Sequence, residues 1–430
     1  MTPTAVAAVV VFAVVYVLIA SEKIDRIAAV LGGAGVLALI GVITVDTGFH
    51  APETGIDWNV IFLLFGMMVI VSVTKQTGVF EYVAILAAKL ARGRPFAVMV
   101  TLVLVTAVAS ALLDNVTTVL LIAPVTLLVC DRLRQAPEPY LIAEALASNI
   151  GGTATLIGDP PNIIIGSRAG LDFNAFLWHL GPIVVVLLAV FIGLAWLMWG
   201  RTMVADAKAA ENVMRLDEKE AISNPRLLVS CAVVLLLVLA GFVTHSITHI
   251  DPSIVALLGA GVLVAVSRLG PKEFLEDVEW STLVFFMGLF MLVGSLVHVG
   301  VIEQLGRWLA ESVGDRLLFA GTVLLFVSGI LSAIIDNIPY VATLTPIVSE
   351  MTGPGSGPLD PLWWALALGA DLGGNATAIG ASANVVIIGI AARNGHPISF
   401  WRFTRYGVLV AAVTLVIAWA YWALRYVVLA

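Results

Sequence analysis

The sequence has few charged residues for its length. Only 22 lysines and arginines and 29 aspartates and glutamates occur among 430 residues, so 12% of the chain is charged while 60% is hydrophobic. Soluble globular proteins carry about 25% charged residues, and half that share does not cover a soluble surface of this size. The composition therefore excludes an ordinary cytosolic enzyme, a nucleic-acid binder and a disordered protein. It predicts an all-α integral membrane protein with many spans.

Residues that hold metals or cofactors are also scarce. The two cysteines, Cys130 and Cys231, lie far apart and outside any CxxC pattern, which argues against a disulfide framework or a structural zinc site. The six histidines are scattered in loops or at the ends of spans, so no metal site is predicted. No GxxxxGK[ST] sequence is present, and hence no ATP site accompanies the chain. We expect no cofactor.

Long apolar runs dominate the chain, each near the roughly 17–25 residues that cross a bilayer. Two further apolar regions, 95–130 and 317–350, are interrupted by Asp-Asn pairs and are predicted to be re-entrant hairpins. The hydrophilic stretch 201–226 carries charges of both signs and is predicted to be a cytoplasmic linker. The ten predicted spans are 4–20, 27–44, 57–75, 139–165, 179–200, 227–245, 253–268, 279–297, 361–389 and 406–425.

The chain repeats itself at an offset of 222 residues. This single register extends over more than 100 residues, which indicates an internal duplication with a first repeat at 1–200 and a second at 227–430. The register aligns Trp58 with Trp280, Asp114-Asn115 with Asp336-Asn337, Pro124 with Pro346, Gly151-Gly152 with Gly373-Gly374, Ala154-Thr155 with Ala376-Thr377, and Asn162 with Asn384.

The basic residues predict how the two repeats sit in the membrane. With a cytoplasmic linker and two re-entrant hairpins, 18 of the 22 lysines and arginines are inside, and only Arg168, Arg307, Arg316 and Arg425 are outside. Each half then has five spans and one hairpin, so the second repeat is inverted relative to the first. Inverted repeats with discontinuous helices that meet at the membrane midplane are typical of secondary transporters.

Polar residues inside a membrane are costly and mark function. They cluster at the two hairpin tips and in two broken helices, 148–162 and 370–384, where Gly-Gly pairs and Pro160-Pro161 weaken the helix and free backbone groups. Such groups suit a proton or Na⁺, with Asn115 and Asn337 as candidate Na⁺ ligands. The candidate substrate- and ion-binding residues are Asp114, Asn115, Thr117, Thr118, Asn149, Thr153, Thr155, Asp159, Asn162, Asp336, Asn337, Asp371, Asn375, Thr377, Ser382 and Asn384.

Each polar element also has a purely structural interpretation. An Asp before a helix can be a plain N-cap, and a Gly-Gly pair in a membrane helix can serve close packing. Four such elements in one register, facing each other by inverted symmetry, favour the functional interpretation. For Glu144 two interpretations stay open, a further coupling carboxylate or a side chain that reaches the interface.

The motifs DNVTTVLLIAPV and ASNIGGTATLIGDPPNIIIGS, at 114–125 and 147–167, resemble those of the ion transporter superfamily. Within it the chain resembles the ArsB/NhaD group, which has a citrate-transporter-like domain and includes arsenite and antimonite efflux permeases, sodium/proton antiporters and the melanosomal P protein. The resemblance implies a homodimer in which a transport domain moves against a scaffold by an elevator motion. Divalent anion/sodium symporters are more distant relatives and carry Ser-Asn-Thr at their hairpin tips. Here Asp114 and Asp336 replace that Ser, which disfavours a dicarboxylate and favours coupling to protons or Na⁺.

The sequence therefore predicts an ion-gradient-driven secondary active transporter of the cytoplasmic membrane. Proton-coupled efflux of arsenite, antimonite or a related small inorganic ion is the first hypothesis, and sodium/proton exchange is the second. Transport of citrate or another anion is the third. The expected partners are the ion substrate, the lipid bilayer, a second copy of the chain and, as a further option, a separate ATPase subunit. A channel and an intramembrane aspartyl protease are the alternatives from other classes.

Overall fold

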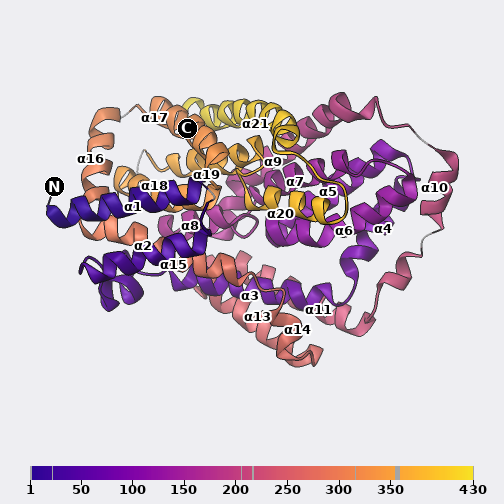
Figure 1. Ribbon diagram of the computed structural model, residues 1–430, viewed down its shortest axis with the longest axis horizontal. Helices are drawn as coiled ribbons and strands as arrows, with labels where there is room; N and C mark the ends of the chain where they lie inside the picture. Colours follow the sequence, from indigo (N-terminus) through magenta and orange to yellow (C-terminus); the bar gives the residue numbers. More distant parts are fainter. Residues whose placement is uncertain are drawn as a thin grey trace.

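The computed structural model describes residues 2–21, 23–204, 206–215, 217–314, 316–353 and 359–429, and throughout these residues the protein is helical (Figure 1). The helices of the first repeat are α1 (Pro3–Ser21), α2 (Arg26–Leu39), α3 (Trp58–Lys75), α4 (Val79–Leu90), α5 (Pro95–Leu112), α6 (Asn115–Leu133), α7 (Glu138–Gly152), α8 (Pro160–Ala169) and α9 (Phe173–Ala195). A π-helical turn, Trp196–Gly200, continues α9.

The second repeat has the same order of elements. Its helices are α11 (Pro225–Val243), α13 (Pro252–Ser267), α15 (Trp280–His298), α16 (Val301–Val313), α17 (Leu317–Ile334), α18 (Asn337–Thr352), α19 (Leu362–Gly373), α20 (Ser382–Arg393) and α21 (Phe400–Ala423). Short helices α10 (Ala207–Met214), α12 (His245–Thr248) and α14 (Pro271–Leu275) connect them. Gly78 and Gly300, equivalent at the offset of 222, have φ of 78° and 74° where each repeat turns from a long helix into an amphipathic one. Only glycine adopts this backbone conformation without strain.

Eight helices in the described residues are long and apolar enough to cross a membrane, and the protein is a multi-pass membrane protein. Three of the eight are arms of the predicted hairpins, namely α5, α6 and α17. Three predicted boundaries were wrong by five residues or more. The span predicted at 27–44 is helical only to Leu39, and the span predicted to begin at residue 406 begins at Phe400. The span predicted to begin at residue 179 begins at Phe173, where the Asp172 carboxylate accepts a hydrogen bond from the Ala175 N–H. That cap fixes the helix start within a stretch of moderate hydropathy.

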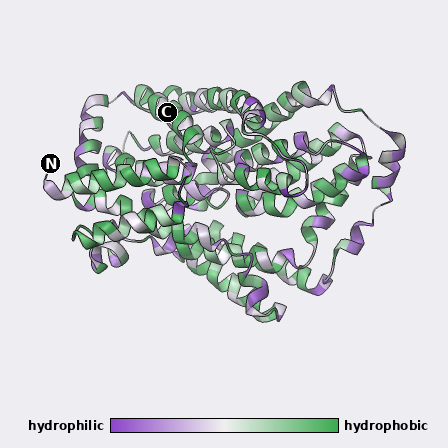
Figure 2. Ribbon diagram, in the orientation of Figure 1, coloured by the Kyte–Doolittle hydropathy of each residue, from purple (hydrophilic) through white to green (hydrophobic). Residues whose placement is uncertain are grey.

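The helices form two groups. A smaller group comprises α1, α2, α3, α11, α13, α14 and α15, most of which run along the lower side of the molecule in Figure 1. A larger group contains both hairpins and both broken helices, in which α5 packs on α7 and, equivalently, α17 on α19. Apolar side chains cover the long helices, and hydrophilic residues gather in the connecting segments (Figure 2). Along α13, Ile254, Leu258, Val262 and Val266 are 48–64% exposed on one face, as expected of a surface against lipid.

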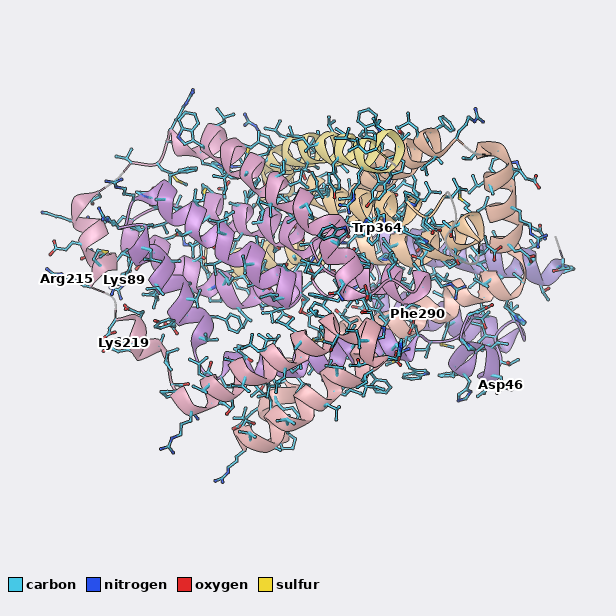
Figure 3. The ribbon with its side chains drawn as sticks, turned by 180° about the vertical axis from the view of Figure 1, so that it is seen from behind. Asp46, Lys89, Arg215, Lys219, Phe290 and Trp364 are labelled. Atoms are coloured by element: carbon cyan, nitrogen blue, oxygen red, sulfur yellow. The ribbon has the colours of Figure 1, made fainter. Side chains whose placement is uncertain are left out.

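The linker lies at one end of the molecule. In Figure 3, Lys89, Arg215 and Lys219 lie at this end and Asp46 lies at the opposite one. Lys89 Nζ is 2.5 Å from Glu218 Oε2, and this hydrogen bond lowers the pKa of the Glu218 carboxyl. The linker, which carries five basic and five acidic residues, and the acidic loop that contains Asp46 therefore lie at opposite ends of the molecule, in line with their predicted places on opposite membrane faces.

Candidate functional site

The tips of the two hairpins meet at one carboxylate. Asp159 lies at the break between α7 and α8 and is 1% exposed. Its Oδ2 accepts a hydrogen bond of 2.9 Å from Asn115 Nδ2 at the tip of the first hairpin, formed by α5 and α6. Asn337 Nδ2, at the tip of the second hairpin, formed by α17 and α18, lies 3.4 Å from Asp159 Oδ1. Asn115 and Asn337, which are 222 positions apart in the chain, thus converge on Asp159, as two facing hairpins require.

The buried side-chain amide of Asn149 connects the two broken helices. Asn149, in α7, accepts a hydrogen bond of 3.1 Å from Asn115 on its Oδ1. Its Nδ2 donates to Asn375 Oδ1 and to Asn384 Oδ1, both at 3.0 Å. All four amide side chains are at most 2% exposed. The network joins the first hairpin tip to both breaks without a charged group, so it fixes their mutual position.

The duplication is visible in identical side-chain to backbone hydrogen bonds. Ser110 Oγ donates to the Ser148 carbonyl oxygen at 2.6 Å, and its equivalent Ser332 donates to Ala370 at 2.6 Å. Thr155 and Thr377 donate to the carbonyls of Ala111 and Ala333 at 2.5 and 2.6 Å. Asn162 and Asn384 donate to the carbonyls of Thr155 and Thr377 at 3.0 and 2.9 Å. These bonds satisfy carbonyls that the helix breaks leave free.

The Gly-Gly pairs allow the breaks to touch the hairpins. A Cβ on Gly151 would lie 2.2 Å from the Ala107 carbonyl oxygen, and one on the equivalent Gly373 would lie 2.4 Å from that of Gly329. Within each break, a Cβ on Gly152 would lie 2.5 Å from the Gly158 oxygen. The glycines therefore serve close packing, and this packing brings the broken helices to the hairpin tips.

Four aspartates surround this centre, each in a different environment. Asp371 is fully buried, and neither of its carboxylate oxygens has a hydrogen-bond partner among the described residues. Asp114 accepts a bond of 2.8 Å from the Thr117 N–H and thus caps α6, as the structural interpretation expects. Of the four, Asp336 is in an ion pair with an arginine, Arg26. Asp159 lies within electrostatic reach of the other three.

Other predicted site residues lie at the same centre. Thr153 donates to the Asn149 carbonyl oxygen at 2.9 Å, and Ser382 donates to Asp336 Oδ2 at 2.7 Å. Thr118 is buried, and its hydroxyl has no partner in the described part of the chain. The Oδ1 atoms of Asn115 and Asn162 are likewise buried and unpartnered. Oxygen atoms without partners beside carboxylates form a site that suits protons or a small cation.

Three residues of this region were missed by the sequence prediction. Arg26 was counted only as a cytoplasmic loop charge, although it pairs with Asp336 at 3.3 Å. Glu279, at the N-terminus of α15, and Tyr16, whose hydroxyl contacts the Pro339 carbonyl oxygen and Thr343, complete the contacts between the two helix groups. All three lie outside the polar motifs, and no local pattern marks them.

The chemistry of the centre follows from charge and burial. Several carboxylates lie close together at low exposure, and desolvating them all in the ionised form costs several kcal/mol each. Protons or a bound cation remove that cost. The centre lies between the two hairpin tips, so Asp159 contacts both repeats.

Comparison with known proteins places the chain among transporters. Residues 16–369 match the family described as CitMHS, citrate transporter. An uncharacterised transporter of Mycobacterium tuberculosis is 56% identical over 426 residues, which cover 99% of this chain and 99% of that protein. The P protein of Homo sapiens is 36% identical over 494 residues, covering 96% of this chain and 59% of the P protein.

The fold also matches a solved structure. The crystal structure of the Alcanivorax borkumensis YdaH transporter, whose title reports an unusual topology, superposes with a TM-score of 0.57 over 97% of each chain at 15% identity. This match confirms the predicted all-helical, multi-pass membrane fold, which is similar to that of the YdaH transporter. The inversion of the second repeat relative to the first stays a prediction. The predicted resemblance to the ion transporter superfamily and to the P protein is confirmed as well, whereas the assignment to the ArsB/NhaD group stays a prediction.

Proposed function

The chain belongs to the CitMHS citrate transporter family, and we propose that it exports a small inorganic solute, with arsenite or antimonite first, in exchange for protons across the cytoplasmic membrane. As a secondary transporter of this family it is not an enzyme, which removes the intramembrane protease alternative. The proposal concerns the substrate, the coupling ion and the direction of transport.

The observation that carries the proposal is the environment of Asp159. One buried carboxylate accepts hydrogen bonds from the tips of both hairpins, with Asp371, Asp336 and Asp114 in electrostatic reach. A proton that binds here neutralises charge at the point where the two repeats meet. Loading and unloading this centre thereby changes the balance between conformations that face opposite sides.

The charge of this acidic centre also favours some substrates over others. Arsenite is mainly a neutral hydroxylated species near pH 7, and it can exchange hydrogen bonds with the amides of Asn115, Asn149 and Asn337 without a cationic partner. A citrate trianion would meet three or four acidic side chains and one arginine, so transport of a free carboxylate requires protons or a cation to accompany it. Sodium/proton exchange is the second candidate, because the unpartnered oxygens of Asp371 and Asn115 are suitable Na⁺ ligands.

We further propose that the protein works as a homodimer by an elevator motion. The larger helix group, which holds both hairpins, would move against the smaller one. The separation of the helices into these two groups supports the proposal. A separate ATPase subunit stays a further option for the partner.

A substrate screen tests the proposed function. The purified protein is reconstituted in liposomes with an imposed pH or Na⁺ gradient, and uptake of arsenite, Na⁺ and citrate is measured against protein-free liposomes. The proposal expects arsenite accumulation that collapses when a protonophore removes the pH gradient. Accumulation of citrate but not arsenite, or equilibration without concentration, would reject it, and the second outcome would indicate a channel.

A further inference from the structure

A cavity of about 580 Å³ lies between the two helix groups, beside the site. Ile19, Arg26 and Glu279 line it from the smaller group, and Leu120, Asp336 and Ser382 line it from the larger one. It adjoins the turn between α1 and α2, which the basic residues predict to be cytoplasmic. The cavity thus lies between this turn and the tip of the second hairpin.

Arg26 occupies the inner wall of this cavity. Its Nη1 is 3.3 Å from Asp336 Oδ2 and 3.4 Å from Ser382 Oγ, and its guanidinium lies over the Phe285 ring, 5.2 Å from the centroid. The side chains of Arg26 and Asp336 are 34% and 16% exposed, so the pair is partly desolvated and yet within reach of solutes in the cavity. Because Arg26 belongs to α2 and Asp336 to the hairpin tip, this ion pair joins the two helix groups.

The arginine is not part of the duplicated site. At the offset of 222 residues, Asp336 corresponds to Asp114. Arg26 is the first residue of α2, and the first residue of the equivalent helix α13 is Pro252. Asp114 accordingly has the Thr117 N–H as its hydrogen-bond donor and no basic side chain in an ion pair within the described residues. A positive charge has therefore been added at one of two otherwise equivalent acids, the one that faces the cavity.

We propose that Arg26 is a tethered competitor for the cation that Asp336 binds. In the cation-free protein, its guanidinium holds the cation position and ties the second hairpin to α2, which stabilises the conformation that faces the cavity. A small monovalent cation that enters the cavity displaces it and frees the hairpin to move. This inference rests on the proposed ion-coupled transport and adds a positioning residue to it.

Glu279 supplies the second position of the displaced arginine. Its Oε2 accepts a hydrogen bond of 3.0 Å from Thr282, while its Oε1 is buried and has no partner among the described residues. It belongs to the smaller helix group, as Arg26 does, and the two interact electrostatically. A guanidinium released from Asp336 can therefore move to Glu279 without leaving its own group, so its charge stays compensated in both conformations.

The test uses cysteine accessibility in the cavity with Na⁺ as the probe. Ser281→Cys, on the exposed cavity wall, is labelled with a maleimide in proteoliposomes. The labelling rate is measured while Na⁺ replaces choline at constant ionic strength. The native Cys130 and Cys231 are buried and do not compete for the label. In choline, Arg26→Gln should lower the labelling rate about threefold, because the tether is lost. The Na⁺ concentration that gives half of the full change in labelling rate should fall about fivefold in the same variant.

Three further variants make the result specific. Arg26→Lys keeps the charge but loses the stacking on Phe285, so its half-effective Na⁺ concentration should lie between those of the parent and of Arg26→Gln. Glu279→Gln should raise the half-effective Na⁺ concentration, because the displaced guanidinium loses its acceptor. Lys23→Gln, a loss of the same charge three residues away, should change nothing. Equal labelling rates for the parent and for Arg26→Gln in choline, or indifference of both proteins to Na⁺, would overturn the proposal. Absence of arsenite transport alongside the expected labelling would count against the proposed function alone.

Discussion

Single residues break the symmetry of the duplicated site. At the offset of 222, Asp159 corresponds to Ala381 and Asp371 corresponds to Asn149, so each repeat contributes one acid that the other lacks. The amides and hydroxyls that support the helix breaks are duplicated, whereas these two carboxylates are not. The shared amides and hydroxyls build the frame, and Asp159 and Asp371 add one unshared carboxylate from each repeat to the two shared acids, Asp114 and Asp336.

Asp159→Asn should abolish coupled transport and leave the fold intact. The amide has nearly the same shape and can still accept from Asn115, but it carries no exchangeable proton. We expect initial transport rates in proteoliposomes to fall at least about a hundredfold, as for a group used in the coupling step itself. Asp46→Asn, at an exposed residue at the far end of the molecule, is the control. Full coupled transport by Asp159→Asn would contradict the account.

A measurement of stability can decide the role of Glu144, which is a buried acid. Thr126 donates to its Oε1, its Oε2 has no partner among the described residues, and its equivalent in the second repeat is Leu366. Replacing both partners of a buried hydrogen bond with apolar groups of the same shape can be nearly neutral, whereas replacing one partner leaves the other unsatisfied. Glu144→Leu combined with Thr126→Val should therefore leave the free energy of unfolding unchanged within about 1 kcal/mol. A loss of more than about 2 kcal/mol in denaturant unfolding would show that the carboxyl is structurally required.

The predicted acids and the missed ones differ in how they are placed. Asp114, Asp159, Asp336 and Asp371 stand out in the sequence because each interrupts an apolar run, and a charge within a membrane needs a reason. Arg26 and Glu279 stand at the ends of spans, where charge is ordinary. Their contact with the second hairpin depends on how α2 and α15 cross it, which is a tertiary property that no local pattern encodes.

At the scale of elements, the breaks and the hairpins depend on backbone contact. Gly151 lies against Ala107 and Gly373 against Gly329, so the first half of each broken helix approaches one arm of a hairpin at backbone distance. The sequence predicted these elements well because their glycine and proline pairs stand beside polar residues within apolar runs; a Gly-Gly pair alone is not sufficient, since Gly32-Gly33 lies inside α2. The end of α2 at Leu39 and the starts of α9 and α21 at Phe173 and Phe400 were predicted poorly, since a turn or a single cap decides each of them within apolar sequence.

Gly151→Ala should destabilise the protein, because its Cβ would lie 2.2 Å from a backbone oxygen that cannot move without shifting α5. Overpacking of this kind costs about 1–3 kcal/mol. Gly193→Ala is the matched control, since a Cβ there meets nothing within 4 Å. We expect a clear fall in the midpoint of thermal unfolding in detergent for the first variant, and an unchanged or higher one for the second. Equal midpoints would show that the contact is not tight.

At the scale of the whole molecule, charge and shape agree on an orientation. The linker, which holds five lysines and arginines, and the acidic loop at 46–57, which holds none, lie at opposite ends (Figure 3). The predicted orientation has the linker in the cytoplasm and the loop outside. Composition alone was sufficient to predict the all-helical membrane class, because it is a property summed over many residues, whereas the inversion of the second repeat stays a prediction.

Cysteine labelling tests that orientation in intact cells. His50→Cys should react with a membrane-impermeant maleimide before the cells are opened, and Lys219→Cys should react only afterwards. Both residues are exposed, so a failure to label reports on the side of the membrane and not on burial. Reaction of Lys219→Cys in intact cells would reverse the orientation and place the cavity on the outside.

The central claim is that movement of a solute is coupled to protons through the carboxylates around Asp159. The most direct measurement is the internal pH of proteoliposomes, read from a trapped pH-sensitive dye, when arsenite is added outside without any imposed gradient. Arsenite entry should drive protons out and raise the internal pH, and Asp159→Asn should remove this signal. Arsenite movement with no change of internal pH, or an equal change with Asp159→Asn, would contradict the account.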